Sequence, residues 1–236
     1  MSTFRVGDPG SPVEIKLSGI FHSVQGEGLN AGVPMVFVRL YGCNLACPWC
    51  DTGYSPQARK GVLVKDISHN YTTTIGDIVE KVKEYGCPNI IITGGEPFFQ
   101  ANQLYQLILS LRATGKKRII LETNGAITHP VVPTIIKLID YMSVSPKLGT
   151  NWEEPFINNA DEVRCATSSI EDIIQYDRGL DIMNYNGVRI LSPIDASPEA
   201  SKLIFDFLKT PLGNRWRYSI QLQKLIDFGE EDWGKD

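Results

Sequence analysis

An α/β fold with a mainly parallel sheet, curved into a partial, incomplete TIM-like barrel, is the architecture that this sequence predicts. Short β-branched runs alternate with segments whose apolar residues recur at helical spacing, and this alternation is typical of parallel strands joined by helices. Reactive motifs directly follow several runs, where α/β barrels carry their active sites. We find no repeat or low-complexity stretch. We therefore expect one domain over residues 1–236, with 1–12 as an N-terminal extension.

The expected strands are short and β-branched, as in strands that are buried on both faces. The four clearest runs are residues 36–40, 90–93, 118–122 and 141–144. Three further runs fit the description less strongly, namely residues 162–165, 188–191 and 218–220.

Three helices are expected in the connections. Apolar residues stand at i, i+3, i+4 and i+7 from Ile75, with Thr74 available as N-cap and Gly86 as C-terminal stop. The same spacing from Leu104 predicts the second helix. Ser197, which precedes a proline, predicts the start of the third, because the missing donor of proline costs nothing in a first turn.

Composition excludes several classes of protein. The chain has 236 residues, 42% hydrophobic and 21% charged, which suits a soluble globular protein with a sizeable core. Its net charge of −4 gives no basic surplus for direct nucleic-acid or anionic-membrane binding. Its apolar runs fall far short of the ~20 residues of a membrane helix. The N-terminus lacks the apolar core of a signal peptide, so we expect a cytoplasmic protein with reduced thiols.

Three of the five cysteines form a Cys-x3-Cys-x2-Cys cluster, Cys43, Cys47 and Cys50, just after the run 36–40. Thiolates from one such loop can hold three irons of a cubane and leave the fourth iron open to a substrate. A structural zinc site would need a fourth ligand nearby, and no histidine has that spacing. Zinc or incidental thiols are the alternatives. Cys87 and Cys165 are isolated and are expected in the core.

The cysteine motif, with a tryptophan before its last cysteine, resembles the signature of radical S-adenosylmethionine enzymes, which have a full or partial α/β barrel. In that family the thiolates hold a [4Fe-4S] cluster, and the amino and carboxylate groups of S-adenosylmethionine chelate the open iron. Gly94-Gly95-Glu96-Pro97 follows the run 90–93 and resembles the family motif that receives the methionyl amino group. Glycines expose backbone acceptors, and Glu96 would supply a countercharge.

The resemblance also implies the remaining contacts to S-adenosylmethionine. Residues 145–147 read Ser-Pro-Lys and close the run 141–144, as in the family, although a strand-ending turn would have the same sequence. The implied cofactor-binding residues are Trp49, Asp51, Gly95, Glu96, Ser145, Pro146 and Lys147.

Within this superfamily, residues 15–52 closely resemble the 7-carboxy-7-deazaguanine synthase family. That resemblance implies that Arg39 binds a substrate carboxylate and that the Thr52 hydroxyl binds Mg²⁺. Independently, a charge inside an apolar strand is costly unless a ligand or an internal carboxylate pairs with it. A solvated glycine-rich turn is the alternative for residues 25–28. The implied substrate-binding residues are Val24, Gln25, Gly26, Glu27, Arg39 and Thr93.

The resemblance implies a lyase of queuosine and 7-deazaguanine biosynthesis. It would convert 6-carboxy-5,6,7,8-tetrahydropterin to 7-carboxy-7-deazaguanine with loss of ammonia, using a 5′-deoxyadenosyl radical that takes hydrogen from C6. The implied cofactors are a [4Fe-4S] cluster, S-adenosylmethionine and Mg²⁺; the implied partners are the pterin, an electron donor such as flavodoxin or ferredoxin, and a second copy of the chain. A glycyl-radical activase acting on a protein, and a non-catalytic metal-binding protein, are the alternatives.

Two positions depart from the family pattern. Gln223 stands where the family usually carries histidine, and Ser192 stands where glutamine is frequent. Residues 122–125 resemble a segment at the rim of the family's active site, although they too suit a turn. Substrate handling is therefore the part of the function that the resemblance fixes least.

Overall fold

The described part of the chain, which in this computed structural model comprises residues 12–50, 70–115 and 117–226, contains nine strands. They are β1 (Glu14–Val24), β2 (Pro34–Leu40), β3 (Tyr71–Thr74), β4 (Asn89–Gly94), β5 (Arg118–Thr123), β6 (Tyr141–Val144), β7 (Glu162–Thr167), β8 (Val188–Pro193) and β9 (Trp216–Tyr218). One sheet contains them all, in the order β3-β1-β2-β4-β5-β6-β7-β8-β9. Neighbours from β2 to β9 are parallel, whereas β1 runs antiparallel to both β2 and β3.

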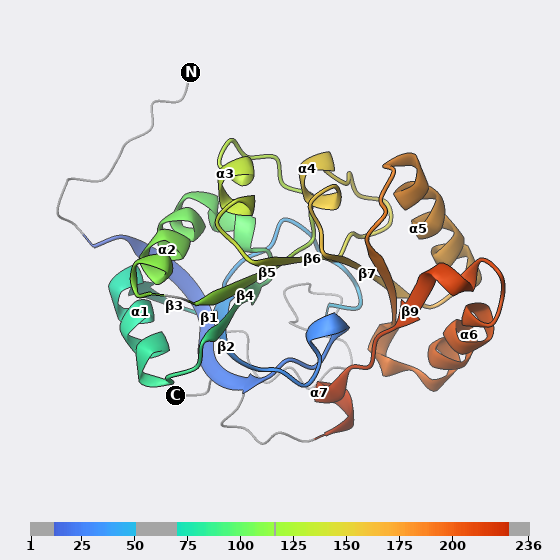
Figure 1. The fold of residues 1–236 in the computed structure, drawn as a ribbon, viewed down its shortest axis with the longest axis horizontal. Coiled ribbons are helices and arrows are strands. Elements are labelled where there is room, and N and C mark those ends of the chain that lie inside the picture. Colours follow the sequence, from blue (N-terminus) through green and yellow to red (C-terminus); the bar gives the residue numbers. More distant parts are fainter. Residues whose placement is uncertain (1–11, 51–69, 116, 227–236) are drawn as a thin grey trace.

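Helices fill the connections between the strands. The α-helices are α1 (Ile75–Glu84), α2 (Ala101–Ala113), α3 (Val132–Ile136), α4 (Glu154–Ile157), α5 (Ile170–Ile182), α6 (Pro198–Leu208) and α7 (Leu222–Leu225). The 3₁₀ helices are η1 (Gly28–Asn30), η2 (Pro97–Gln100), η3 (Ile194–Ala196) and η4 (Gly213–Arg215). Helices α1 to α6 lie around the outside of the curved sheet, and η1 and α7 lie on its other side (Figure 1). The arrangement is the expected partial barrel, with β3 and β9 as its edges.

Six of the seven expected strands are confirmed, with ends that differ by a few residues. The seventh was placed too late, because β9 begins at Trp216 and the chain leaves the strand after Tyr218. The ring of Trp216 is buried, whereas Ile220 is exposed, so the apolar anchor of this strand precedes the expected run. Strands β1 and β3 were not expected, although β1 alternates buried and exposed residues as a strand with one buried face does.

The helix ends follow the local signals. Thr74 caps α1 in a capping box with Asp77, and Gly86 adopts a positive φ of 66° just beyond the helix. Ser197 accepts a hydrogen bond from the Ala200 amide at the start of α6. The expected N-caps at Thr74 and Ser197 and the expected C-terminal stop at Gly86 are therefore confirmed. Helix α5 was missed, although it also begins with a capping box.

The core has two layers, one on each face of the sheet. The larger layer packs the outer face against the helices and includes Cys87 and Cys165, as expected. The smaller layer lies on the concave face and consists of Phe21, Met35, Phe37, Ile91 and Ile120. Met35, Phe37, Ile91 and Ile120 come from early and central positions of their strands, so the concave face is apolar there. Polar side chains occupy the same face toward the carboxyl ends of the strands.

The edge strand β9 is held to α5 by buried charges. Asp177 accepts hydrogen bonds from Arg189 at 3.0 Å and from the indole nitrogen of Trp216 at 2.9 Å, and Arg215 pairs with its other oxygen. Asp181 pairs with both arginines from the exposed side of the cluster. A single carboxylate thus joins α5, β8 and β9.

Asp177→Ala is expected to lower the free energy of unfolding by about 3–5 kcal/mol, because it leaves the buried Arg189 without its inner partner. Denaturant titration followed by circular dichroism measures the change. Asp206→Ala is the control, since Asp206 pairs only with exposed lysines, and it should cost less than about 1 kcal/mol. Equal small losses in both variants would contradict the assigned role of Asp177.

Candidate active site

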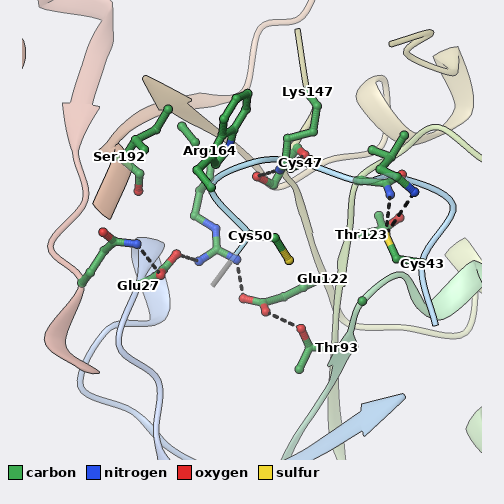
Figure 2. A pocket seen from close by; sticks show the side chains of 18 of the residues that line it. Glu27, Cys43, Cys47, Cys50, Thr93, Glu122, Thr123, Lys147, Arg164 and Ser192 are labelled. Carbon is green, nitrogen blue, oxygen red and sulfur yellow. Dashed lines mark hydrogen bonds and ion pairs between the residues drawn. The ribbon is translucent and has the colours of Figure 1, made fainter. Parts of the chain in front are cut away.

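A cavity of about 220 Å³ opens at the carboxyl ends of the parallel strands (Figure 2). Nine of the residues expected from the sequence line it, namely Glu27, Cys43, Cys47, Trp49, Cys50, Thr93, Gly95, Ser145 and Lys147. They come from the loop after β1, the loop after β2, and the ends of β4 and β6. The topology therefore gathers motifs that are distant in sequence around one space.

Close backbone contact joins the cysteine loop to the glycine motif after β4. The Gly95 amide donates to the Leu40 carbonyl at 3.2 Å, and the Glu96 amide donates to the Gly42 carbonyl at 2.9 Å. A Cβ on Gly95 would lie 2.3 Å from the Gly42 oxygen and 2.9 Å from Cβ of Cys43. Only glycine fits there, so this residue fixes how closely the two motifs approach.

The carboxylate of Glu96 points into the protein and does not line the cavity. It accepts hydrogen bonds from the Phe98 amide at 3.0 Å, the Thr123 hydroxyl at 2.7 Å and the Asn124 amide at 2.6 Å. Complete burial raises the pKa of this carboxyl. These contacts tie the end of β4 to the end of β5. The arrangement gives Glu96 a positioning role, and its role as a countercharge to S-adenosylmethionine stays a prediction.

The thiol side of the cavity also carries a lysine. The Nζ of Lys147 donates to the carbonyl and hydroxyl oxygens of Ser145 at 2.6 and 2.7 Å. Burial lowers the pKa of Lys147 and raises the pKa of the Cys43 and Cys47 thiols. A positive charge beside thiolates favours their ionised form.

The three thiols suit an iron–sulfur cluster. Cys43, Cys47 and Cys50 lie outside any disulfide, are half-buried and line the same cavity. Within the described residues, no three His, Cys, Asp or Glu side chains are placed to hold one metal ion, as a zinc site would require. In a cubane each thiolate binds a different iron, so the sulfur atoms need not converge on a single ion.

A buried arginine organises the opposite side of the cavity. The guanidinium of Arg164 on β7 donates to Glu27 at 2.8 Å and pairs with Glu122 (Figure 2). It also lies 3.3 Å from Glu162. Its Nε also donates to Ser143 at 2.8 Å. Burial opposes the charge, yet the three carboxylates raise the pKa of Arg164. Glu27 and Glu122 face the cavity together because they share this guanidinium.

Glu162 on β7 holds the loop after β1 in place. Its carboxylate accepts the Leu29 amide at 2.7 Å, the Tyr141 hydroxyl at 2.9 Å and the Ser143 hydroxyl at 2.8 Å. Gly28 has a φ of +66°, and a Cβ there would lie 2.2 Å from a Glu162 oxygen. The glycine-rich segment 25–28 is therefore packed against β7. The alternative interpretation of this segment as a solvated turn is wrong.

Glu122 is held in its ionised form by its neighbours. Burial would raise the pKa of its carboxyl, but the charge of Arg164 and hydrogen bonds from Thr93, Arg164 and Gln25 hold it below the ordinary value. Thr93 donates at 2.8 Å and Gln25 at 3.1 Å. Gln25 thus positions Glu122 without lining the cavity.

Several other expected residues that the structure describes lie outside the cavity lining. Arg39 is the register partner of Thr93 on the neighbouring strand, and its guanidinium carbon lies 5.7 Å from the centre of the Phe21 ring. Val24, Gly26 and Pro146 are likewise absent from the lining. Asp51 and Thr52 fall outside the described residues, so the magnesium site stays a prediction.

Several lining residues were not expected from the sequence as site residues. Arg164 carried the same signal as Arg39, a charge within an apolar strand, and could have been found by it. Asp195 follows β8 with a φ of 56°, a strained conformation typical of functional loops. Gln221 enters the cavity from the C-terminal segment that resembles a family segment and carries the departure at Gln223, but only Gln223 was singled out there. Glu122 and Ser192 had been noted only as a rim residue and as a departure.

Comparison with known families accounts for this combination of fold and thiol site. Residues 37–174 match the model of the radical SAM superfamily, which covers more than half of the chain. The chain therefore belongs to the radical SAM superfamily, whose members bind S-adenosylmethionine at a [4Fe-4S] cluster.

Relatives with similar sequences identify the family within this superfamily. The chain is 34% identical over 231 residues to 7-carboxy-7-deazaguanine synthase of Neisseria meningitidis, with 89% of this chain and 92% of the relative covered. It is 34% identical over 213 residues to that of Bacteroides thetaiotaomicron, covering 90% and 97%. It is a member of the 7-carboxy-7-deazaguanine synthase family. The crystal structure of QueE from Escherichia coli has the same fold, with a TM-score of 0.70, 24% identity, and 88% and 94% coverage.

Acid is expected to remove the stabilisation that Glu122 provides. Folding lowers the pKa of the Glu122 carboxyl from its ordinary value of 4.5. Its contribution to the free energy of unfolding is therefore complete above the pKa of the unfolded state, and it is lost as pH falls through the pKa of the folded state. The Glu122→Gln variant cannot titrate at this position. Its unfolding free energy, measured by denaturant titration, should fall less than that of the wild type between neutral pH and acid. Parallel losses would show that Glu122 is not coupled to folding.

Proposed function

We propose that this chain converts 6-carboxy-5,6,7,8-tetrahydropterin to 7-carboxy-7-deazaguanine with loss of ammonia, in the biosynthesis of queuosine and other 7-deazaguanines. The supporting observation is that one cavity has three thiols on one side and two arginine-bound carboxylates, Glu27 and Glu122, on the other. The first side suits a radical-generating cofactor. The second suits a substrate rich in N–H donors.

The thiol side would hold the cofactors. Cys43, Cys47 and Cys50 would bind three irons of the [4Fe-4S] cluster, and the cluster with S-adenosylmethionine would supply the radical that removes a substrate hydrogen. Gly95 and Lys147 line the same side, together with Ser145 and Trp49. Glu96 holds the glycine motif in place through Thr123 and Asn124. The protein's part is to orient both molecules and exclude water.

The carboxylate side would hold the substrate. An aminopyrimidinone ring presents N–H groups along one edge, and ionised carboxylates accept hydrogen bonds from such groups. Arg164 fixes Glu27 and Glu122 through ion pairs, and its charge lowers the pKa of Glu122. Arg39 would bind the substrate carboxylate, since a guanidinium matches that group. The Thr52 hydroxyl would be one of the few protein ligands of Mg²⁺.

The wider setting follows from the chemistry. The cluster needs an external one-electron donor, for which flavodoxin or ferredoxin is our candidate, and we assign the chain to homodimers. Within the described residues no helix is long and apolar enough to cross a bilayer. We place the reaction in the cytoplasm, where thiols stay reduced. We treat the chain as one catalytic domain.

Anaerobic reconstitution tests the activity. Iron- and sulfide-loaded protein, supplied with S-adenosylmethionine, Mg²⁺, dithionite and 6-carboxytetrahydropterin, is expected to form 7-carboxy-7-deazaguanine, detected by mass spectrometry. Cys47→Ala should form none, because the cluster loses one of its three thiolates. Cys87→Ala is the matched control, since Cys87 is a core thiol, and it should retain the activity. Product formation by Cys47→Ala would contradict the mechanism.

Arg39→Ala is expected to lower kcat/KM for the pterin on the order of 10- to 100-fold, the loss of a charge-assisted hydrogen bond. Cluster assembly should be unchanged, as judged by iron content and visible absorbance. Arg112→Ala, on the outer face beside Asp140, is the control and should leave turnover unchanged. Unaltered pterin kinetics in Arg39→Ala would refute its carboxylate-binding role.

A further inference from the structure

One wall of the cavity has an unsatisfied acceptor. The side-chain oxygen of Gln221 is buried and has no hydrogen-bond partner in the part of the chain that the structure describes, although Gln221 itself is only 8% exposed and lines the cavity. A buried acceptor that stays unpaired has lost its hydrogen bonds to water without replacing them, which is unfavourable. A ligand that places a hydrogen-bond donor beside this unpaired oxygen would supply the missing hydrogen bond.

Glu27 decides which end of the Gln221 amide is available. The Nε2 of Gln221 donates to the Oε1 of Glu27 at 3.1 Å, while Arg164 holds the other oxygen of the same carboxylate. An ionised carboxylate only accepts hydrogen bonds, so the amide must turn its nitrogen toward Glu27. The oxygen is thereby fixed as an acceptor.

Gln223 provides an internal comparison. Its Nε2 donates to the same Glu27 oxygen at 2.6 Å, and its own side-chain oxygen also lacks a partner within the described residues. That oxygen, however, packs against Gly26, where a Cβ would lie only 2.1 Å from it. Gln223 does not line the cavity. The two glutamines therefore make the same contact to Glu27, but only Gln221 borders the substrate space.

We propose that Gln221 is a specificity-determining residue that accepts a hydrogen bond from an N–H group of the substrate's aminopyrimidinone ring. Together with Glu27 and Glu122 it forms a wall of acceptors matched to the donor edge of that ring. This inference rests on the proposed function, because it takes the pterin as the ligand. Gln223 is a positioning residue that acts through Glu27 alone.

Calorimetric titration with 6-carboxypterin, a stable oxidised analogue of the substrate, tests the assignment. The protein is reconstituted with its cluster and saturated with S-adenosylmethionine under anaerobic conditions. Gln221→Met keeps the side-chain length and removes both the donor and the acceptor. Gln223→Met removes the same donor to Glu27 and nothing that borders the cavity.

We expect Gln221→Met to weaken analogue binding roughly tenfold, and Gln223→Met to weaken it less than about twofold. Thermal unfolding checks that both variants are folded. If Gln221→Met does not fold, Gln221→Asn replaces it, because its shorter amide withdraws the carbonyl and should give the same loss.

Two results would overturn the inference in different ways. Equal losses in the Gln221 and Gln223 variants would mean that Gln221 acts only by fixing Glu27, and the proposed function would stand. Failure of the wild type to bind 6-carboxypterin would overturn the proposed function, and the role of Gln221 with it.

Discussion

The interaction on which the site depends is the buried cluster of Arg164 with Glu27, Glu122 and Glu162. Burial removes water from these three carboxylates and brings their negative charges close together. The guanidinium compensates for both effects. Because the acidic residues come from the loop after β1, from β5 and from β7, one side chain joins three distant segments. The cluster still carries more negative than positive charge. It therefore favours a ligand that brings donors and opposes one that brings only acceptors.

The second constraint is space between backbones. Gly95 lets the glycine motif contact the cysteine loop, and Gly28 lets the loop after β1 rest against Glu162. The apolar side chains of the concave face fill the region behind these polar groups. The site is consequently a polar layer on an apolar floor, with thiols on one side and carboxylates on the other. That division matches a reaction in which a radical source and a nitrogen-rich substrate must meet in a fixed geometry.

The parallel part of the fold could be predicted because its signals are local. β-branched runs, helical spacing and capping residues each act within a few positions, so they are readable without knowledge of the partners. Strand β1 was not expected because it is not a short β-branched run of the parallel kind; it pairs antiparallel with β2 and β3 and buries one face. Strand β9 was displaced because its anchor is a long-range contact, the hydrogen bond from Trp216 to Asp177 on α5. The position of β9 therefore depends on a contact with a distant residue, which its local sequence does not show.

The sequence alone determined the cysteine spacing, the glycine motif and the position of each directly after a predicted strand, because these depend on covalent distance and chain periodicity. It also pointed to Arg39 as a charge in need of a partner. Only the tertiary structure decided that Glu96 faces inward, that Arg164 holds three acidic groups, and that Gln221, in the cavity lining, gives its nitrogen to Glu27. Those outcomes depend on which side chains meet across the sheet. Strand register and burial determine these side-chain contacts, and neither can be predicted from the residues adjacent in the sequence.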